Sequence, residues 1–245
     1  MTNHELTIPL RDGKTAYARL AGDWSKPLIV FVHGLTGSMD EILPYEAAKY
    51  FTKHDYGFLA FNLYDWREGS RHLANCTLAV HARDLDDVVA YAREQGAPTI
   101  HVVGHSYGGL TALLSSAQGF NSAILLDPAH PAVPPFDDVI YLKEIDGYLA
   151  RGSIDHVFSR VFVEENRNLK TEEIISQYHL PTLVVSAGDG ILVDAGADYV
   201  DRLKDRVLAR QSVIAGADHC FTAEAAREQA FAEMLSWLQS AKELD

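Results

Sequence analysis

The sequence predicts an α/β fold built on a mostly parallel sheet, and three observations support this. Short runs made only of apolar residues recur along the chain, which is typical of strands buried on both faces. Longer stretches with apolar residues at helical spacing lie between these runs. With 245 residues, 47% of them hydrophobic, the chain is long enough for one domain with a sizeable core. Strands and helices that alternate in this way form parallel sheets with right-handed crossovers.

The first half of the chain is expected to open with a hairpin. Asp12-Gly13 is a strong turn signal, and it separates apolar stretches at 6–10 and 15–20. The later elements follow from apolar runs and from helical periodicity. We expect strands at 28–32, 58–61 and 100–103, helices at 40–51 and 77–94, and a further helix that begins just after Ser106.

The second half contains a segment, 129–180, that shows no convincing buried strand. Apolar residues at helical spacing, with Ser153 as N-cap, predict one helix there, and 171–178 predicts another. On either side of this segment we expect strands at 123–126, 182–185 and 212–214, and helices at 195–203 and 223–238. The prediction is a single domain, 1–245, in which 129–180 is a helical insertion over the edge of the sheet.

The charge and composition argue against several classes of partner. A formal net charge of −13 disfavours binding to nucleic-acid phosphates and to anionic membranes. The two cysteines, Cys76 and Cys220, make no disulfide framework, and the histidines show no metal-binding spacing. The first residues lack a signal-peptide pattern, and no apolar stretch approaches the length of a membrane span. We expect a cytoplasmic protein with no metal, no nucleic-acid partner and no membrane insertion.

The stretch Gly104-His105-Ser106-Tyr107-Gly108 is a Gly-x-Ser-x-Gly pattern between an apolar strand and an apolar helix. Ser106 is expected at the apex of a tight strand-to-helix turn, with its hydroxyl presented above the sheet edge. The two flanking glycines leave room for the strand and the helix to approach each other. This context predicts that Ser106 is a nucleophile.

A serine hydroxyl needs a histidine that takes its proton and a carboxylate that orients the histidine. His219 follows the last expected strand in a Gly-containing loop, where its imidazole can lie over the sheet edge. Asp189 follows the penultimate strand, and serine, aspartate and histidine then stand in the chain order known for such turns. We therefore predict Asp189 as the acid, and Asp127 and Asp194 remain alternatives.

The same chemistry needs two N–H donors for the negative oxygen of the tetrahedral intermediate. His33-Gly34 follows the central apolar strand, and the backbone there can place the N–H of Leu35 opposite that of Tyr107. We expect these two amides to form an oxyanion hole, and we expect His33 to hold the loop through hydrogen bonds.

With these residues in order, the chain resembles the α/β-hydrolase superfamily over nearly its whole length. The resemblance rests on His33-Gly34, on the Ser106 pentapeptide, and on Asp189 and His219, each of which follows an expected strand. It implies an eight-stranded, mostly parallel sheet with helices on both faces and a small helical cap after strand 6. The loop 33–37 is also similar to one in several small carboxylesterases. Two departures are the unusual loop 62–70 and Ser186 in place of the common glycine before the acid.

The sequence thus predicts a serine hydrolase that cleaves a carboxylic ester of a small to medium substrate through an acyl-enzyme on Ser106, without a cofactor. We expect Thr36, His130 and Tyr141 to line the substrate pocket. Thioester, amide or carbon–carbon bond hydrolysis and cofactor-free haloperoxidase activity stay open, because one fold serves many reactions. A non-catalytic binder of a small ligand is a further alternative. The substrate and the oligomeric state are left open by the sequence.

Overall fold

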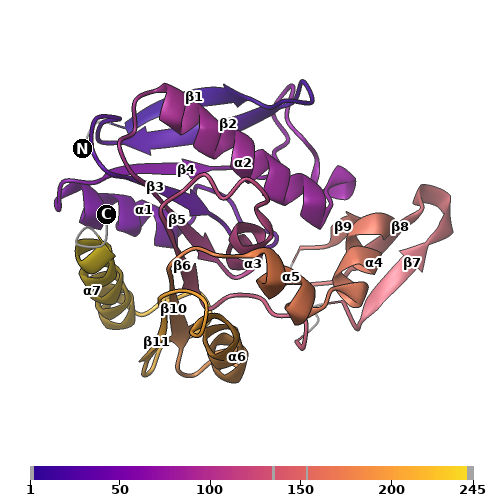
Figure 1. The fold of residues 1–245 in the computed structure, drawn as a ribbon. Coiled ribbons are helices and arrows are strands. Elements are labelled where there is room, and N and C mark those ends of the chain that lie inside the picture. Colours follow the sequence, from indigo (N-terminus) through magenta and orange to yellow (C-terminus); the bar gives the residue numbers. More distant parts are fainter. Residues whose placement is uncertain (1–2, 134–135, 153, 242–245) are drawn as a thin grey trace.

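The computed structural model describes residues 3–133, 136–152 and 154–241. Over these residues the main sheet has eight strands in the order β1-β2-β4-β3-β5-β6-β10-β11 (Figure 1). β1 (Asn3–Pro9) and β2 (Thr15–Ala21) form the expected hairpin, and β2 pairs antiparallel with β4 (Gly57–Phe61). From β4 onward all pairings are parallel, through β3 (Leu28–Val32), β5 (Ile100–His105), β6 (Ser122–Leu126), β10 (Thr182–Ala187) and β11 (Ala209–Ile214).

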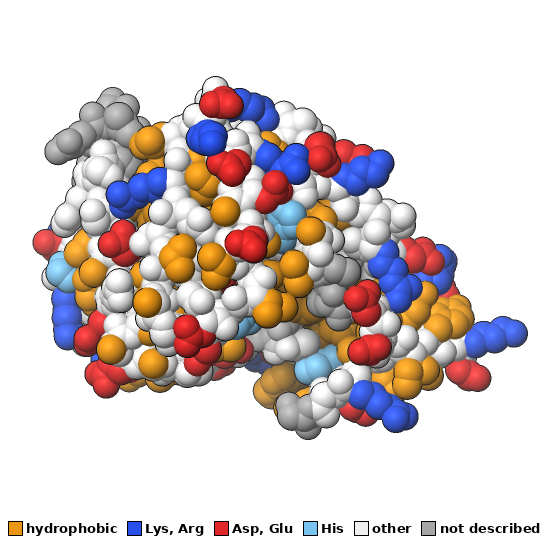
Figure 2. Space-filling model, turned by 90° about the horizontal axis from the view of Figure 1, so that it is seen from below, with side chains coloured by type: hydrophobic (Ala, Val, Ile, Leu, Met, Phe, Trp, Pro, Cys, Tyr) orange, Lys and Arg blue, Asp and Glu red, His pale blue; other side chains and the backbone are white. Residues whose placement is uncertain are grey.

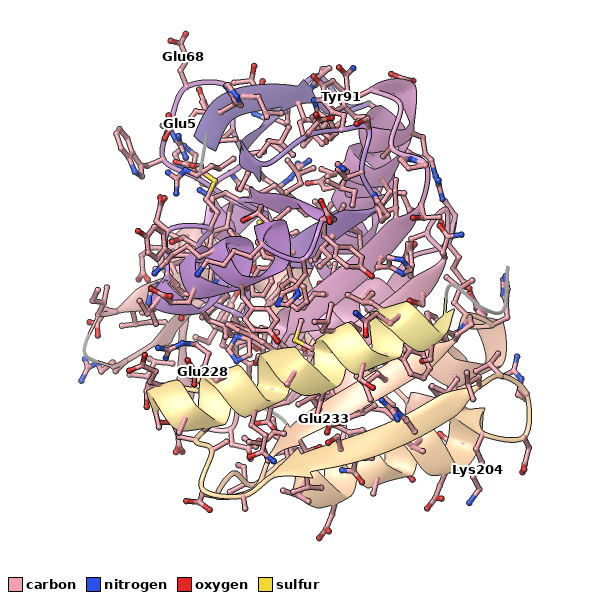
Figure 3. All side chains as sticks on the ribbon, turned by 90° about the vertical axis from the view of Figure 1, so that its left-hand side faces the viewer. Glu5, Glu68, Tyr91, Lys204, Glu228 and Glu233 are labelled. Atoms are coloured by element: carbon pink, nitrogen blue, oxygen red, sulfur yellow. The ribbon has the colours of Figure 1, made fainter. Side chains whose placement is uncertain are left out.

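Helices cover both faces of this sheet. α1 (Ile42–Thr52) and α7 (Glu224–Ala241) lie together on one face, and Figure 3 shows α7 running across it with α1 beside it. α2 (Leu78–Glu94), α3 (Tyr107–Leu114) and α6 (Val193–Leu203) pack on the other face. Because side chains alternate along a strand, each central strand contributes residues to the cores on both faces of the sheet. In β3, Ile29 and Phe31 join the core under α1 and α7, whereas Val30 and Val32 join the core under α2 and α3.

The parallel arrangement decides where function is possible. Because parallel strands all end at the same sheet edge, the residues that follow β3, β5, β6, β10 and β11 meet there. The register confirms this for the central strands, since His105 at the end of β5 lies opposite Leu126 at the end of β6, and Leu126 lies opposite Val185. The loops after these strands carry the residues singled out in the sequence.

The segment 129–180 differs from the purely helical insertion that the sequence predicts. It contains a second, three-stranded antiparallel sheet of β7 (Val139–Leu142), β8 (Gly147–Ala150) and β9 (His156–Ser159). A helix, α4 (Arg160–Asn168), starts only after Ser159, whose hydroxyl accepts from the Phe162 amide, and α5 (Thr171–Gln177) follows. The expected N-cap, Ser153, lies outside the described residues. The helical assignment of 154–159 was wrong: residues 156–159 form the strand β9, whose two faces differ in burial.

The two faces of β9 explain this error. Phe158 is buried against Phe136 and Phe162, whereas its neighbour Val157 is only partly buried on the opposite side of the strand. Two adjacent apolar residues therefore satisfy a strand as well as a helix. The hydrophobic side chains at the right-hand end of the face in Figure 2 lie over this insertion, and elsewhere on that face acidic and basic side chains are mixed.

Polar contacts fasten the insertion to the main domain. The hydroxyl of Tyr107 donates to Oδ1 of Asn166 on α4. The carboxylate of Glu165, the preceding residue, accepts from the amide of Leu78 at the start of α2 at 2.7 Å. The hydroxyl of Ser159 donates to the carbonyl of Cys76 at 2.9 Å. The insertion therefore has a defined position beside the edge of the sheet.

Among the described residues, no helix combines the length and the apolar character that a membrane crossing requires.

Candidate active site

Ser106 occupies the expected turn between β5 and α3. Its backbone has φ 53° and ψ −115°, a conformation that non-glycine residues adopt only where the surroundings impose it. The carbonyl of Ser106 accepts from the amide of Ala129 at 3.0 Å, and its amide donates to the carbonyl of Leu126 at 2.9 Å. The side chain is half-buried. The turn thus holds a strained serine at the carboxyl edge of the sheet, where it remains accessible.

The two flanking glycines are required by contact between strand and helix. A Cβ atom at Gly104 would lie 2.3 Å from the carbonyl carbon of Gly108. A Cβ atom at Gly108 would lie 2.1 Å from the carbonyl oxygen of Val32, at the end of β3. No side chain fits at these distances. The pattern Gly-x-Ser-x-Gly is therefore explained by packing around Ser106.

His219 is paired with Asp127, which follows β6. Oδ2 of Asp127 lies 2.6 Å from Nδ1 of His219, and Oδ1 accepts from the amide of Ala187 at 3.1 Å. The Asp127 side chain is 1% exposed and that of His219 is 42% exposed. An ionised carboxylate only accepts hydrogen bonds, so Nδ1 of His219 carries the hydrogen and Nε2 has a free lone pair. This is the arrangement that a general base needs.

Asp189, the acid predicted from the sequence, does not occupy this position. It is exposed, and its backbone amide donates to the carbonyl of Ala217 at 3.0 Å. The turn after β10 brings Gly190 next to Asp127, where a Cβ atom would lie 3.3 Å from Oδ2 of that carboxylate. The carboxylate that reaches His219 therefore comes from the neighbouring strand, and a glycine in the Asp189 loop leaves space for it. The other alternative, Asp194, is exposed in the first turn of α6.

A second histidine supports the loop that carries His219. Nε2 of His105 lies 2.7 Å from the carbonyl oxygen of His219, and the two rings are 5.0 Å apart. Burial, together with the nearby His219, lowers the pKa of His105 to about 4. A neutral His105 that donates through Nε2–H thus fixes the backbone of the His219 loop. Phe221 of the same loop has φ 51° and is buried in the core under α1 and α7.

The loop after β3 lies against Ser106. A Cβ atom at Gly34 would be 3.2 Å from Cβ of Ser106, so the loop passes close to Ser106 with little room for a side chain between them. Nε2 of His33 accepts from the amide of Leu63 at 3.1 Å, which leaves Nδ1–H to donate to the carbonyl of Gly34 at 2.7 Å. Burial lowers the pKa of His33 to about 4 and keeps the ring neutral in this role.

This hydrogen bond also orients the amide that follows. The Gly34 carbonyl accepts further hydrogen bonds from the amide of Gly37 at 3.1 Å and from the hydroxyl of Tyr64 at 3.4 Å. The C=O and N–H of a trans peptide point in opposite directions, so the N–H of Leu35 points away from these donors. Within the described part of the chain, neither this amide nor that of Tyr107 has a hydrogen-bond acceptor. Both are available to a ligand next to Ser106.

A cavity of about 550 Å³ adjoins this loop. Its walls come from the loop after β3, from residues 62–73, and from β9 of the insertion. Thr36, which the sequence analysis assigns to the substrate pocket, is among the described residues that line this cavity, whereas Ser106 and His219 are not. The residues that the sequence did not assign to a pocket include Asn62, Tyr64 and His72, which lie in the polar connection after β4. The one sequence feature that could have pointed to these lining residues is the long polar loop that follows β4.

The other two residues expected in the pocket are not part of its lining. His130 is buried, with Nε2 at 3.1 Å from Oδ2 of Asp198 and Nδ1 accepting from the amide of Ala132. Tyr141 is 46% exposed on β7 and donates to Oδ1 of Asp146 at 2.7 Å. Both side chains are engaged in contacts within their own segment or with α6. Among the described residues, no group of three or more His, Cys, Asp or Glu side chains is placed to hold a metal.

Solved structures with the same fold cover nearly the whole chain. Est1E from Butyrivibrio proteoclasticus, in its structure with ferulic acid bound, superposes with a TM-score of 0.78 at 21% identity, covering 96% of this chain and 99% of that one. An esterase domain from a Rhodothermus marinus protein gives 0.71 at 17% identity, over 97% and 98%. A dienelactone hydrolase from Anabaena variabilis gives 0.72 at 14% identity, over 98% and 97%.

A comparison with curated protein sequences gives no significant match. The model of the alpha/beta hydrolase family, in contrast, matches residues 29–234. This range runs from β3 to α7 and includes the loop at His33, the Ser106 turn, Asp127 and His219. The chain therefore belongs to the alpha/beta hydrolase family.

Proposed function

We propose that this protein is a serine hydrolase that cleaves a carboxylic ester, with Ser106 as nucleophile, His219 as base and Asp127 as the acid that orients it. The observation that carries the proposal is the 2.6 Å hydrogen bond between Asp127 and His219 at the sheet edge that also holds the strained Ser106 turn. The assignment of the acid differs from the one drawn from the sequence, and the remaining roles are those expected for the fold.

The reaction has two steps. His219 takes the hydroxyl proton of Ser106 through Nε2 as the oxygen attacks the ester carbonyl, and Asp127 stabilises the resulting imidazolium. The amides of Leu35 and Tyr107 donate to the oxyanion, and each such donor is worth about 3 kcal/mol in the transition state. The C–O bond to the alcohol breaks, and the alcohol leaves with the proton from His219. A water molecule, deprotonated by His219, then hydrolyses the acyl-serine and regenerates the hydroxyl.

The cavity and the structural relatives support a small to medium substrate. About 550 Å³ is within the range of cavities that hold drug-sized molecules. One protein of the same fold is described as an esterase domain, and another, Est1E, has been solved with ferulic acid bound. Both facts favour an ester with one cyclic or medium-length group.

The proposal is tested by covalent labelling. A fluorophosphonate probe reacts only with an activated serine, so we expect a single stoichiometric adduct on Ser106 by mass spectrometry and none in Ser106→Ala. The same protein should hydrolyse p-nitrophenyl esters of graded acyl length, and Ser106→Ala should not. A folded protein that acquires no adduct on Ser106 and hydrolyses no ester would exclude a serine esterase.

A further inference from the structure

The cavity beside the loop after β3 contains charged groups, but these neutralise each other. Arg67 is the one Lys or Arg among the described lining residues, and its Nε and Nη2 donate to Oδ2 of Asp65 at 2.9 and 2.5 Å. The guanidinium also lies 4.0 Å from the centre of the Tyr17 ring. Asp65, whose side chain is 3% exposed, accepts from Asn62 as well. Asp65 thus neutralises the charge of this guanidinium within the cavity wall.

The second acid in the lining is paired in the same way. Oδ1 of Asp40 lies 2.8 Å from Nη2 of Arg19, and that arginine also binds Glu5 at 3.1 Å. A carboxylate that entered the cavity would therefore find, among the described lining residues, no Lys or Arg that is not already paired with an aspartate. A buried or half-buried anion without a partner is costly, so the cavity disfavours such a group.

One carboxylate near the cavity has no cationic partner within the described chain. Glu41 lies against Gly37 of the cavity wall, where a Cβ atom would be 3.0 Å from both of its carboxylate oxygens. Burial, then Asp218 and then Glu41 raise the pKa of the Cys220 thiol, which is next to His219 in the chain. Glu41 therefore lies against the cavity wall at Gly37, on the loop that also carries Gly34 next to Ser106.

The lining residues outside these ion pairs suit an uncharged ligand. The Trp66 side chain is among the lining residues and is 84% exposed, so its indole offers an apolar surface to a ring or a chain. Hydroxyls of Thr36 and Ser38 and the imidazoles of His72 and His156 offer hydrogen bonds around it.

We propose that this cavity is a substrate subsite that accepts an uncharged part of the ester, and that Glu41 makes the enzyme select neutral substrates over those that bear a carboxylate. The inference rests on the proposed esterase activity, and it adds a specificity-determining residue and a substrate class to it. A like charge close to the approaching substrate lowers the local concentration of anions and the stability of their complexes.

The test compares matched esters that differ only in charge. For the acyl side we would use p-nitrophenyl hexanoate and the mono-p-nitrophenyl ester of adipic acid; for the alcohol side, 4-acetoxybenzamide and 4-acetoxybenzoate. Assays at about pH 8 keep an ordinary histidine, with a pKa of about 6.5, uncharged. We expect kcat/KM to favour the neutral member of at least one pair by about tenfold or more in the wild type.

Glu41→Gln should narrow that preference about threefold and leave kcat/KM for the neutral ester within about twofold, as expected for removal of one nearby charge. Added salt should narrow the wild-type preference as well, because it screens charges. Glu94→Gln is the matched control, since this exposed glutamate at the end of α2 lies by the opposite sheet edge and should change neither value.

The outcomes separate the two proposals. Hydrolysis of neutral and anionic esters at equal rates, or a preference that Glu41→Gln leaves unchanged, would overturn the subsite inference while the esterase activity stands. Failure to hydrolyse any neutral ester, together with no fluorophosphonate adduct, would overturn the activity itself and this inference with it.

Discussion

The carboxylate of Asp127 lies 2.6 Å from Nδ1 of His219, although the two residues are 92 positions apart in the chain. Asp127 reaches this position from a backbone with φ 41°, directly after β6, and its second oxygen is held by the amide of Ala187. The Asp127 carboxylate is thus held in place by β6 and β10, and His219 contacts it from the loop after β11. A positioning of this kind keeps the imidazole in one tautomer and one orientation.

The Tyr107 side chain links the nucleophile turn to the insertion. Its hydroxyl is buried and donates to Asn166, so Tyr107→Phe should lower the free energy of unfolding by about 1–3 kcal/mol because it leaves a buried acceptor unsatisfied. Since the amide of the same residue is the proposed oxyanion donor, kcat should also fall about threefold to tenfold with little change in KM. Denaturant titration and steady-state kinetics measure the two effects.

The control for this substitution is Tyr178→Phe. Tyr178 has a fully buried hydroxyl that accepts from Thr182 at 3.0 Å, at the end of α5. Tyr178→Phe should lower the free energy of unfolding by a similar amount and leave kcat unchanged. Equal losses of kcat in both variants would mean that Tyr107 acts only through overall stability.

The strands of the sheet were predictable because burial on both faces demands an unbroken apolar run. The expected strand at 28–32 coincides with β3, and the expected helix at 77–94 differs from α2 by one residue. The strands of the insertion were harder to predict, since each is four residues long and half-exposed, and β8 and β9 are interrupted by glycine or polar residues. Short strands of this kind are specified by the elements against which they pack.

The placement of Ser106 and His219 at one sheet edge was predictable from motif and chain order, whereas it was not predictable which of Asp127 and Asp189 contacts His219. Both aspartates follow parallel strands that end at one edge, so the spacing places both near His219. The difference lies in the backbone, which turns Asp127 inward and leaves Asp189 exposed. No residue pattern predicts the positive φ of Asp127 or the space that Gly190 leaves beside it.

Three buried histidines should make the fold sensitive to acid. Burial lowers the pKa of His33 and His105 to about 4 and that of His81 to about 3. In the unfolded chain a histidine has a pKa near 6.5, so between these values the unfolded state binds more protons. Stability is therefore complete above about pH 6.5 and is lost as the pH falls towards 4, by up to about 1.4 kcal/mol per pH unit for each histidine.

His81 gives this prediction a specific test. Within the described chain neither of its ring nitrogens has a hydrogen-bond partner, and its ring packs near Tyr64 and Phe162. His81→Phe should therefore retain or raise stability at about pH 7.5 and flatten its decline between pH 6.5 and 4. Urea titrations across this range measure both, and an unchanged slope would show that His81 does not titrate on unfolding.

The contact between α3 and β3 predicts a sharp difference between two glycines. Gly108→Ala would place a methyl 2.1 Å from the carbonyl oxygen of Val32, and we expect a loss of about 4 kcal/mol or more, or no folded protein. Gly119→Ala meets only a side-chain methyl of Val89 at 3.4 Å, so its effect should stay within about 1 kcal/mol. Thermal denaturation of the two variants compares them. A stable, active Gly108→Ala protein would contradict the tight packing at the Ser106 turn.

The identity of the acid is tested most directly by kcat for Asp127→Asn beside Asp189→Asn, with thermal denaturation to confirm that both variants are folded. We expect Asp127→Asn to lower kcat by about 10³-fold or more, because His219 loses the carboxylate that sets its tautomer. Asp189→Asn should stay within about threefold of the wild type, since its side chain is exposed and only its backbone amide bonds the His219 loop. The reverse result, with Asp189→Asn inactive and Asp127→Asn active, would contradict the assignment of Asp127 as the acid.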